Sequence, residues 1–226
     1  MRHKKLHSFN INPAQAIKIQ EKLRVKAILR DDFKQISSIA GADVSYRKKG
    51  NKVCAAVVVM SFPELEVIEK ACKTSAVRFP YVPGLLAFRE IPVLLKAFKN
   101  IKSNPDLILV DGQGIAHPRR MGIASHLGVL LDKPTIGCAK TILFGKCQNP
   151  ASKRGSYSHL RDKEGKVIGA ALRTQNNVRP VYVSQGHKVS LKTALKVVLR
   201  CCLRYRIPEP LRLAHTVSKL CIGSRK

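Results

Sequence analysis

The order of its apolar segments is the feature that most limits how this chain can fold. Three strand-like stretches, at residues 36–46, 53–61 and 65–73, follow one another with turn-forming residues between them. This spacing predicts an antiparallel meander of three strands. After residue 85, helix-like and strand-like segments alternate. The whole order predicts an α/β fold, with one mixed sheet covered by helices, in a single domain spanning residues 1–226.

Residues that start or interrupt regular structure set the other expected boundaries. Asn12 and Pro13 predict the start of a helix that runs to about residue 29. Two prolines and a glycine exclude regular structure at residues 78–84. The polar stretch at residues 151–166 is expected to be a surface excursion. The remaining expectations are turns at 48–51 and 62–63, strands at 106–110, 134–139, 167–173 and 180–184, and helices at 85–101, at 123–131, after Ser190 and from about 208–210.

Charge limits the partners of the chain more than its fold. The 226 residues include 42 Lys and Arg against 14 Asp and Glu, a formal net charge of +28. Such an excess opposes compaction through self-repulsion and favours polyanionic partners such as nucleic acid. A source with a generally basic proteome would give the same charge, so charge alone names no chemistry.

One series of basic residues recurs at every fourth position near the C-terminal end. On a helix this spacing would place them on one face, which would either follow phosphates or be simply solvated. The series is Lys188, Lys192, Lys196, Arg200 and Arg204.

Neither apolar runs nor cysteines indicate export or a membrane partner. The longest apolar run, residues 53–60, is too short to span a bilayer, and no apolar signal core follows the charged first residues. Seven cysteines without a C-x-x-C pair predict reduced thiols. We therefore expect a cytoplasmic protein without a membrane partner, and a monomer.

Three carboxylates occur where an apolar core is expected. Asp43 lies inside a strand-like run, Asp111 ends another, and Glu90 lies among apolar neighbours on the helix after Gly84. Burying an unpaired carboxylate is costly, so such groups normally face a cation. Separate core ion pairs would explain one such residue, but three together favour a shared site. Most other acids are expected in exposed turns and strands: Asp31, Asp32, Glu64, Glu66, Asp162 and Glu164.

Carboxylate oxygens are the ligands that Mg²⁺ prefers, and phosphoryl transfer needs its developing charge neutralised. The three acids therefore predict a Mg²⁺ site at neighbouring strand ends. The adjacent glycine-rich stretch at 112–120 does not predict a nucleotide cradle. His117 stands where G-x-G-x-x-G needs its third glycine, and there is no Walker motif.

Several strings in this chain resemble the endonuclease V (deoxyribonuclease V) family over roughly residues 10–220. The most specific pair is PYVPGLLAFRE at 80–90 and VDGQGIAHPR at 110–119. The others are GADVSY at 41–46, IGCAK at 136–140, GH at 186–187 and YRIPEPLR at 205–212.

This resemblance implies a ribonuclease H-like fold, with a central mixed sheet flanked by helices on both faces. It implies that Asp43, Glu90 and Asp111 bind Mg²⁺, with Mn²⁺ as a substitute. Some relatives carry aspartate at the position of His215, so His215 either completes the site through water or is an ordinary helix histidine. Lys140 either contacts the scissile phosphate or is a plain surface lysine.

A second set of residues is expected to recognise the substrate. An enzyme that reads a base must unstack it, and an aromatic side chain on a rigid loop can fill the gap. Tyr81, stiffened by Pro80 and Pro83, is expected to be this wedge; the alternative is a tyrosine packed under the turn. His117 either touches substrate or supports the loop. By resemblance, backbone of the following residues lines a pocket for flipped hypoxanthine: Gly84, Leu85, Leu86, Gly112, Gly122 and Ile123.

The resemblance implies a hydrolase of DNA repair that recognises deoxyinosine. It would cleave the second phosphodiester bond 3′ to the lesion and leave 3′-hydroxyl and 5′-phosphate ends. Two alternatives stay open: an endoribonuclease of the same fold specific for inosine in RNA, and a non-catalytic basic module that binds nucleic acid.

Overall fold

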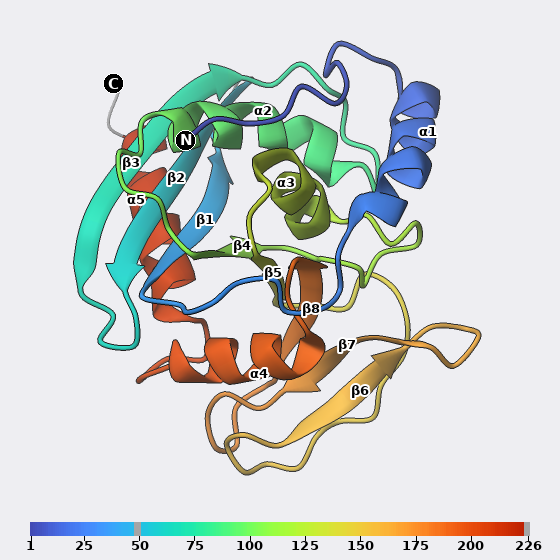
Figure 1. Cartoon of the computed structure of the whole chain (residues 1–226), viewed down its shortest axis with the longest axis vertical. Coiled ribbons are helices and arrows are strands. Elements are labelled where there is room, and N and C mark those ends of the chain that lie inside the picture. The colour runs from blue at the N-terminus through green and yellow to red at the C-terminus, as the bar shows by residue number, and fades with distance from the viewer. Residues whose placement is uncertain (48–50, 224–226) are drawn as a thin grey trace.

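One eight-stranded mixed sheet runs through the computed structural model, which describes residues 1–47 and 51–223 (Figure 1). Its strand order is β3-β2-β1-β4-β5-β8-β7-β6, with β1, β4 and β5 parallel and the other neighbours antiparallel. The strands are β1 (Ser38–Tyr46), β2 (Lys52–Ser61), β3 (Val67–Ala76), β4 (Leu107–Asp111), β5 (Thr135–Ala139), β6 (Tyr157–Arg161), β7 (Val167–Leu172) and β8 (Val181–His187). The expected meander and the expected mixed sheet are both confirmed.

Helices cover both faces of this sheet, as the resemblance implies. Residues of α2 and α3 pack on one face of the sheet, and residues of α4 and α5 pack on the other (Figure 1). The helices are α1 (Pro13–Leu23), α2 (Leu86–Lys99), α3 (Ile123–Leu131), α4 (Leu191–Arg200) and α5 (Glu209–Gly223), with a 3₁₀ turn at Arg24–Lys26.

Strand β2 shows why the central strands read as continuous apolar runs. Successive side chains of a strand point to opposite faces, and a sheet covered on both sides buries both sets. Val57 and Val59 contact the core under α2, whereas Val58 and Met60 contact the core under α4 and α5.

Several sequence expectations need correction. The helix that starts at Pro13 ends at Leu23 and continues only as the 3₁₀ turn, so it is shorter than predicted. The polar stretch at 151–166 contains β6, which was not predicted because Leu160 is its one buried residue. Most of the expected turn at 48–51 lies outside the described residues. Asp162 occupies its expected turn, but its carboxylate is covered and accepts a hydrogen bond from Arg120.

The basic series is only partly helical. Lys192, Lys196 and Arg200 lie exposed on one face of α4, which ends at Arg200. Lys188 precedes the helix and pairs with Asp32 and Asp132, and Arg204 follows it.

None of the helices within residues 1–47 and 51–223 has the length and apolar character needed to cross a bilayer. All seven cysteines lie in these ranges and are thiols.

Candidate active site

A cavity of about 430 Å³ opens where the parallel strands end, beside the first turns of α2 and α3. Strands β1 and β4 are parallel neighbours, with Ala42 opposite Val110. The next residue on each strand, Asp43 and Asp111, therefore reaches the same edge of the sheet. The cavity wall includes twelve of the residues predicted from sequence: Asp43, Tyr81, Pro83, Gly84, Leu86, Glu90, Asp111, Gly112, His117, Gly122, Ile123 and Lys140.

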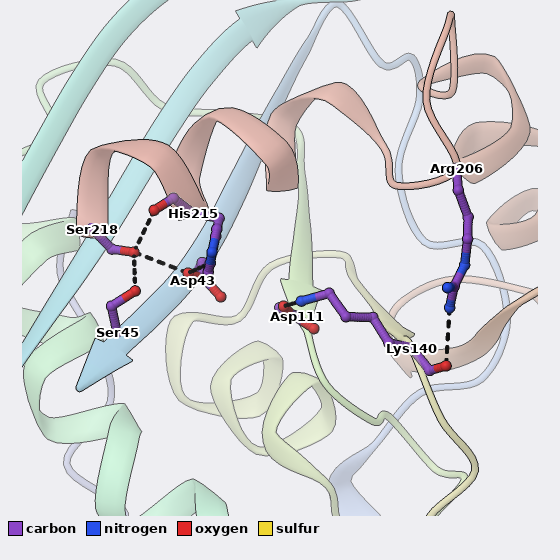
Figure 2. Close-up of polar contacts among 7 residues, drawn as sticks. All are labelled: Asp43, Ser45, Asp111, Lys140, Arg206, His215 and Ser218. Atoms are coloured by element: carbon purple, nitrogen blue, oxygen red, sulfur yellow. Dashed lines mark hydrogen bonds and ion pairs between the residues drawn. The ribbon is translucent and has the colours of Figure 1, made fainter. Parts of the chain in front are cut away.

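Asp43 is held in place by helix α5, although its own strand is β1. Its side chain is 6% exposed, and its Oδ2 accepts from Nδ1 of His215 at 3.0 Å and from Oγ of Ser218 at 3.0 Å (Figure 2). Oγ of Ser218 lies 2.7 Å from Oγ of Ser45, which closes the network. Burial and the neighbouring charge of Asp111 raise the pKa of Asp43. His215 lies outside the cavity wall and acts on the cavity by orienting Asp43.

Glu90 reaches the cavity from the second turn of α2. It is 8% exposed, and its Oε1 accepts from the hydroxyl of Tyr46 at 3.0 Å. Burial raises the pKa of Glu90 to about 8, and the charges of Asp43 and Asp111 act in the same direction. A cation among these carboxylates would remove the repulsion that raises this pKa.

Lys140 follows strand β5 and meets Asp111 at the end of β4. Its Nζ lies 2.6 Å from Oδ2 of Asp111, and its carbonyl oxygen accepts from Nη2 of Arg206 at 3.0 Å (Figure 2). Burial opposes the charged form of Lys140, yet the charge of Asp111 raises the pKa of Lys140 above its ordinary value. A protonated amine therefore lies beside Asp111 at the cavity.

The chemistry of this donor set fits a hard divalent cation. The donors are all carboxylate oxygens, and each carboxylate has a hydrogen-bond or ion-pair partner that fixes its orientation, as ligating carboxylates usually do. Within the described residues, the oxygens of the three acids do not all come within 4.8 Å of one another. Asp111 is turned toward Lys140, and Asp43 toward α5.

A clamp on one carbonyl fixes the loop on the other side of the cavity. The carbonyl oxygen of Gly84 accepts from Nε2 of His117 at 2.8 Å, Nη2 of Arg119 at 3.0 Å and Nε2 of Gln20 at 3.0 Å. Gly84 has φ of +78°, a conformation that glycine adopts without strain. Gln20 lines the cavity but was not predicted as a site residue. The feature that could have identified it is its polar side chain on the buried face of α1.

His117 is a neutral member of this clamp. Burial lowers the pKa of His117 to about 4. Its Nδ1 accepts from the backbone N–H of Arg119 at 3.1 Å, so its proton is on Nε2, which faces the carbonyl of Gly84. Of its two expected roles, the geometry favours support of the loop.

Tyr81 is 75% exposed at the rim of the cavity, so it is not packed under the turn. Two other predicted residues do not line the cavity. Pro80 is exposed next to it, and Leu85 is 1% exposed and packs with Phe79 and Phe88 in the core.

Close backbone packing explains the glycine that precedes α3. A Cβ atom on Gly122 would lie 2.3 Å from the carbonyl oxygen of Gln113. Only glycine lets this helix start against the loop that follows β4. Gln113 was not predicted as a site residue, although it lines the cavity and donates from Nε2 to the carbonyl of Thr141 at 2.9 Å.

The fold and the site are those of a hydrolase of the nuclease class. The acidic cavity lies at the parallel strand ends of a mixed sheet, and a lysine lies beside it. The family model described as Endonuclease V matches residues 21–216. Endonuclease V of Dictyoglomus turgidum is 49% identical over 210 residues, covering 93% of this chain and 91% of that protein. The chain belongs to the endonuclease V family, and it is an enzyme rather than a module that only binds nucleic acid.

Solved structures agree with this assignment. The crystal structure of endonuclease V from Streptomyces avermitilis superposes with a TM-score of 0.91 at 41% identity, covering 96% of each chain. Endonuclease V from Ciona intestinalis, in complex with a 24-mer DNA containing an inosine followed by a ribo-adenosine, superposes with a TM-score of 0.83 at 31% identity. It covers 93% of this chain and 98% of that one.

Proposed function

We propose that this enzyme is a Mg²⁺-dependent endonuclease of DNA repair that recognises deoxyinosine. It cleaves the second phosphodiester bond 3′ to the lesion and leaves 3′-hydroxyl and 5′-phosphate ends. The observation that carries the proposal is one cavity whose wall includes Asp43, Glu90, Asp111 and Lys140 together with the loop glycines at 84, 112 and 122. The inosine-containing DNA bound by the Ciona relative supports the same substrate class.

The acidic side of the cavity serves the chemistry. Asp43, Glu90 and Asp111 would hold Mg²⁺, for which Mn²⁺ substitutes, and the ion supplies an activated water and neutralises developing charge. Lys140 donates to an oxygen of the scissile phosphate. Its present partner, Asp111, keeps the ammonium at the cavity until a phosphate arrives.

The opposite side serves recognition. A volume of about 430 Å³ lies in the range of ordinary small-ligand pockets, and backbone at Gly84, Gly112 and Gly122 borders it. A flipped hypoxanthine would enter here, and the exposed ring of Tyr81 would fill the gap left in the stack. His117 holds the loop that carries Tyr81.

An endoribonuclease acting on inosine in RNA is the second candidate. The specific observation in its favour is the ribo-adenosine that follows inosine in the Ciona complex. A 2′-hydroxyl at that position is what would distinguish the two substrates.

We also propose that the enzyme is a monomer. Its proposed location is the cytoplasm, which suits a protein with seven thiols.

The test is a nicking assay on matched strands that contain deoxyinosine, inosine in RNA, or adenine at the same position. We expect cleavage of the deoxyinosine strand with Mg²⁺ and none with a chelator. Faster cleavage of the RNA strand would favour the second candidate, and cleavage unaffected by the chelator would refute the metal assignment.

A further inference from the structure

Three cysteines from distant parts of the sequence meet on the sheet face that α5 covers. Cys54 lies on β2, Cys72 on β3 and Cys221 on α5, and none of them lines the cavity. In the antiparallel pairing, Cys54 is opposite Thr74 and Cys72 is opposite Ala56. Cys54 and Cys72 are therefore diagonal neighbours on one face, within reach of each other.

The sulfur atoms of these cysteines form a compact group. The three Sγ atoms all lie within 4.8 Å of one another, and Sγ of Cys72 lies 2.8 Å from Sγ of Cys221. Cys54 is fully buried, whereas Cys72 and Cys221 are half-buried. The group therefore has a closed inner side and an outer side that an ion can enter.

We propose that Cys54, Cys72 and Cys221 bind one thiophilic cation of the Zn²⁺ or Cu⁺ class. Thiolate sulfur selects such ions over hard cations. A Zn–S bond of about 2.3 Å places tetrahedral sulfur ligands roughly 4 Å apart, which is within the observed limit of 4.8 Å. Binding would therefore move Sγ of Cys72 and Sγ of Cys221 apart from their 2.8 Å separation. Three sulfurs suffice for Cu⁺, and the half-exposed side leaves a place for water as the fourth ligand of Zn²⁺.

A disulfide is the competing explanation, and it would use only two of these sulfurs. A disulfide between two of them does not explain why all three sulfur atoms, including that of Cys54, lie within 4.8 Å of one another. Burial raises the pKa of Cys54 and of Cys72, and the neighbouring Cys221 adds to both shifts, so a cation has to displace the thiol protons at these two positions. Binding of the cation forms three metal–sulfur bonds and releases the three thiol protons.

The proposed ion would fasten the last turn of α5 to β2 and β3. Cys221 follows Ser218 by three residues on this helix, and Ser218 contacts Asp43 in the active site. The two sites nevertheless take different ions, because one offers carboxylate oxygen and the other thiolate sulfur. The thiol site is therefore distinct from the proposed Mg²⁺ site.

The experiment uses the whole chain, purified in reductant, stripped with a chelator and transferred to reductant-free anaerobic buffer with excess Mg²⁺. Titration with CdCl₂ as a spectroscopic probe should give a thiolate-to-metal absorbance band that saturates at one ion per chain. ZnCl₂ or Cu⁺ should displace the probe, and native mass spectrometry identifies which ion binds more tightly. At about 100 times its Kd, the tighter ion should raise the Tm by roughly 5–10 °C.

Variants separate this site from other thiols. Cys72 and Cys221 are half-buried, so the fold should tolerate Cys72→Ser and Cys221→Ser. Each variant should lose the absorbance band and the rise in Tm. Cys147→Ser, also half-buried but outside the cluster, should keep both. Binding by Cys221→Ser equal to that of the unaltered chain would overturn the proposal. The absence of a saturable band would also overturn it. A purified chain that is two hydrogens lighter, carries a Cys72–Cys221 disulfide and takes up no ion would do the same.

Discussion

Nε2 of His117 donates to the carbonyl oxygen of Gly84 at 2.8 Å and so joins the glycine-rich loop to the loop that carries Tyr81. The two residues are 33 positions apart in the sequence. This contact joins two loops that both border the cavity.

Replacing His117 should therefore weaken recognition more than cleavage. His117→Ala removes one of the three donors to this carbonyl and should lower the free energy of unfolding by about 0.5–1.5 kcal/mol. Binding of deoxyinosine duplex should weaken, while single-turnover cleavage at saturating enzyme should change little. His117→Gln, which keeps an N–H donor, is the matched control. Equal loss of binding and single-turnover rate would show that His117 acts in the chemistry.

Asp111→Asn should keep the fold and lose most cleavage. The amide has the same shape but loses the charge needed for Mg²⁺, and several kcal/mol of transition-state stabilisation correspond to roughly 100-fold or more in rate. The lost ion pair with Lys140 is partly exposed and contributes at most about 1 kcal/mol to folding. Circular dichroism monitors the fold, and Glu164→Gln, an exposed acid, is the control. An unaltered cleavage rate of Asp111→Asn in Mg²⁺ would contradict the assignment of Asp111 as a metal ligand.

Tyr81→Ala should weaken binding to a deoxyinosine duplex by roughly 5- to 150-fold. Base–aromatic stacking contributes about 1–3 kcal/mol, and each 1.4 kcal/mol is a factor of ten. The loss should be smaller on single-stranded substrate, which needs less unstacking, and Tyr81→Phe should retain most of the affinity. Titrations on both substrates measure this. Equal losses on duplex and single strand contradict the wedge.

Binding to undamaged duplex should weaken steeply as salt rises, because phosphate contacts release counterions. If the exposed face of α4 follows phosphates, replacing Lys192, Lys196 and Arg200 by Gln should reduce the slope of log K against log salt by up to about 2.7. Fluorescence anisotropy at several salt concentrations provides the slope. An unchanged slope would identify this face as simply solvated.

Local pattern in the sequence was sufficient for the main architecture. The order of the apolar runs and the turn signals between them predicted the meander, and the capping residues predicted the starts of α1 and α4, because these features depend on neighbours a few residues away. Asp43 and Asp111 stood out for the same reason, since an acid inside a strand-like run is visible without a structure. The resemblance supplied the roles of both acids, and the mixed sheet places them side by side.

Tertiary structure alone decided which side chains support the site and which lie outside it. His215 and Ser218 reach Asp43 from more than 170 positions away, Gln20 reaches Gly84 from another helix, and Leu85 turns into the core. Strand β6 forms because β7 offers it a ladder, not because its own residues are apolar. The three cysteines likewise meet only because α5 crosses β2 and β3. Such contacts follow from how whole elements pack, and the sequence near each residue has no periodicity that would encode them.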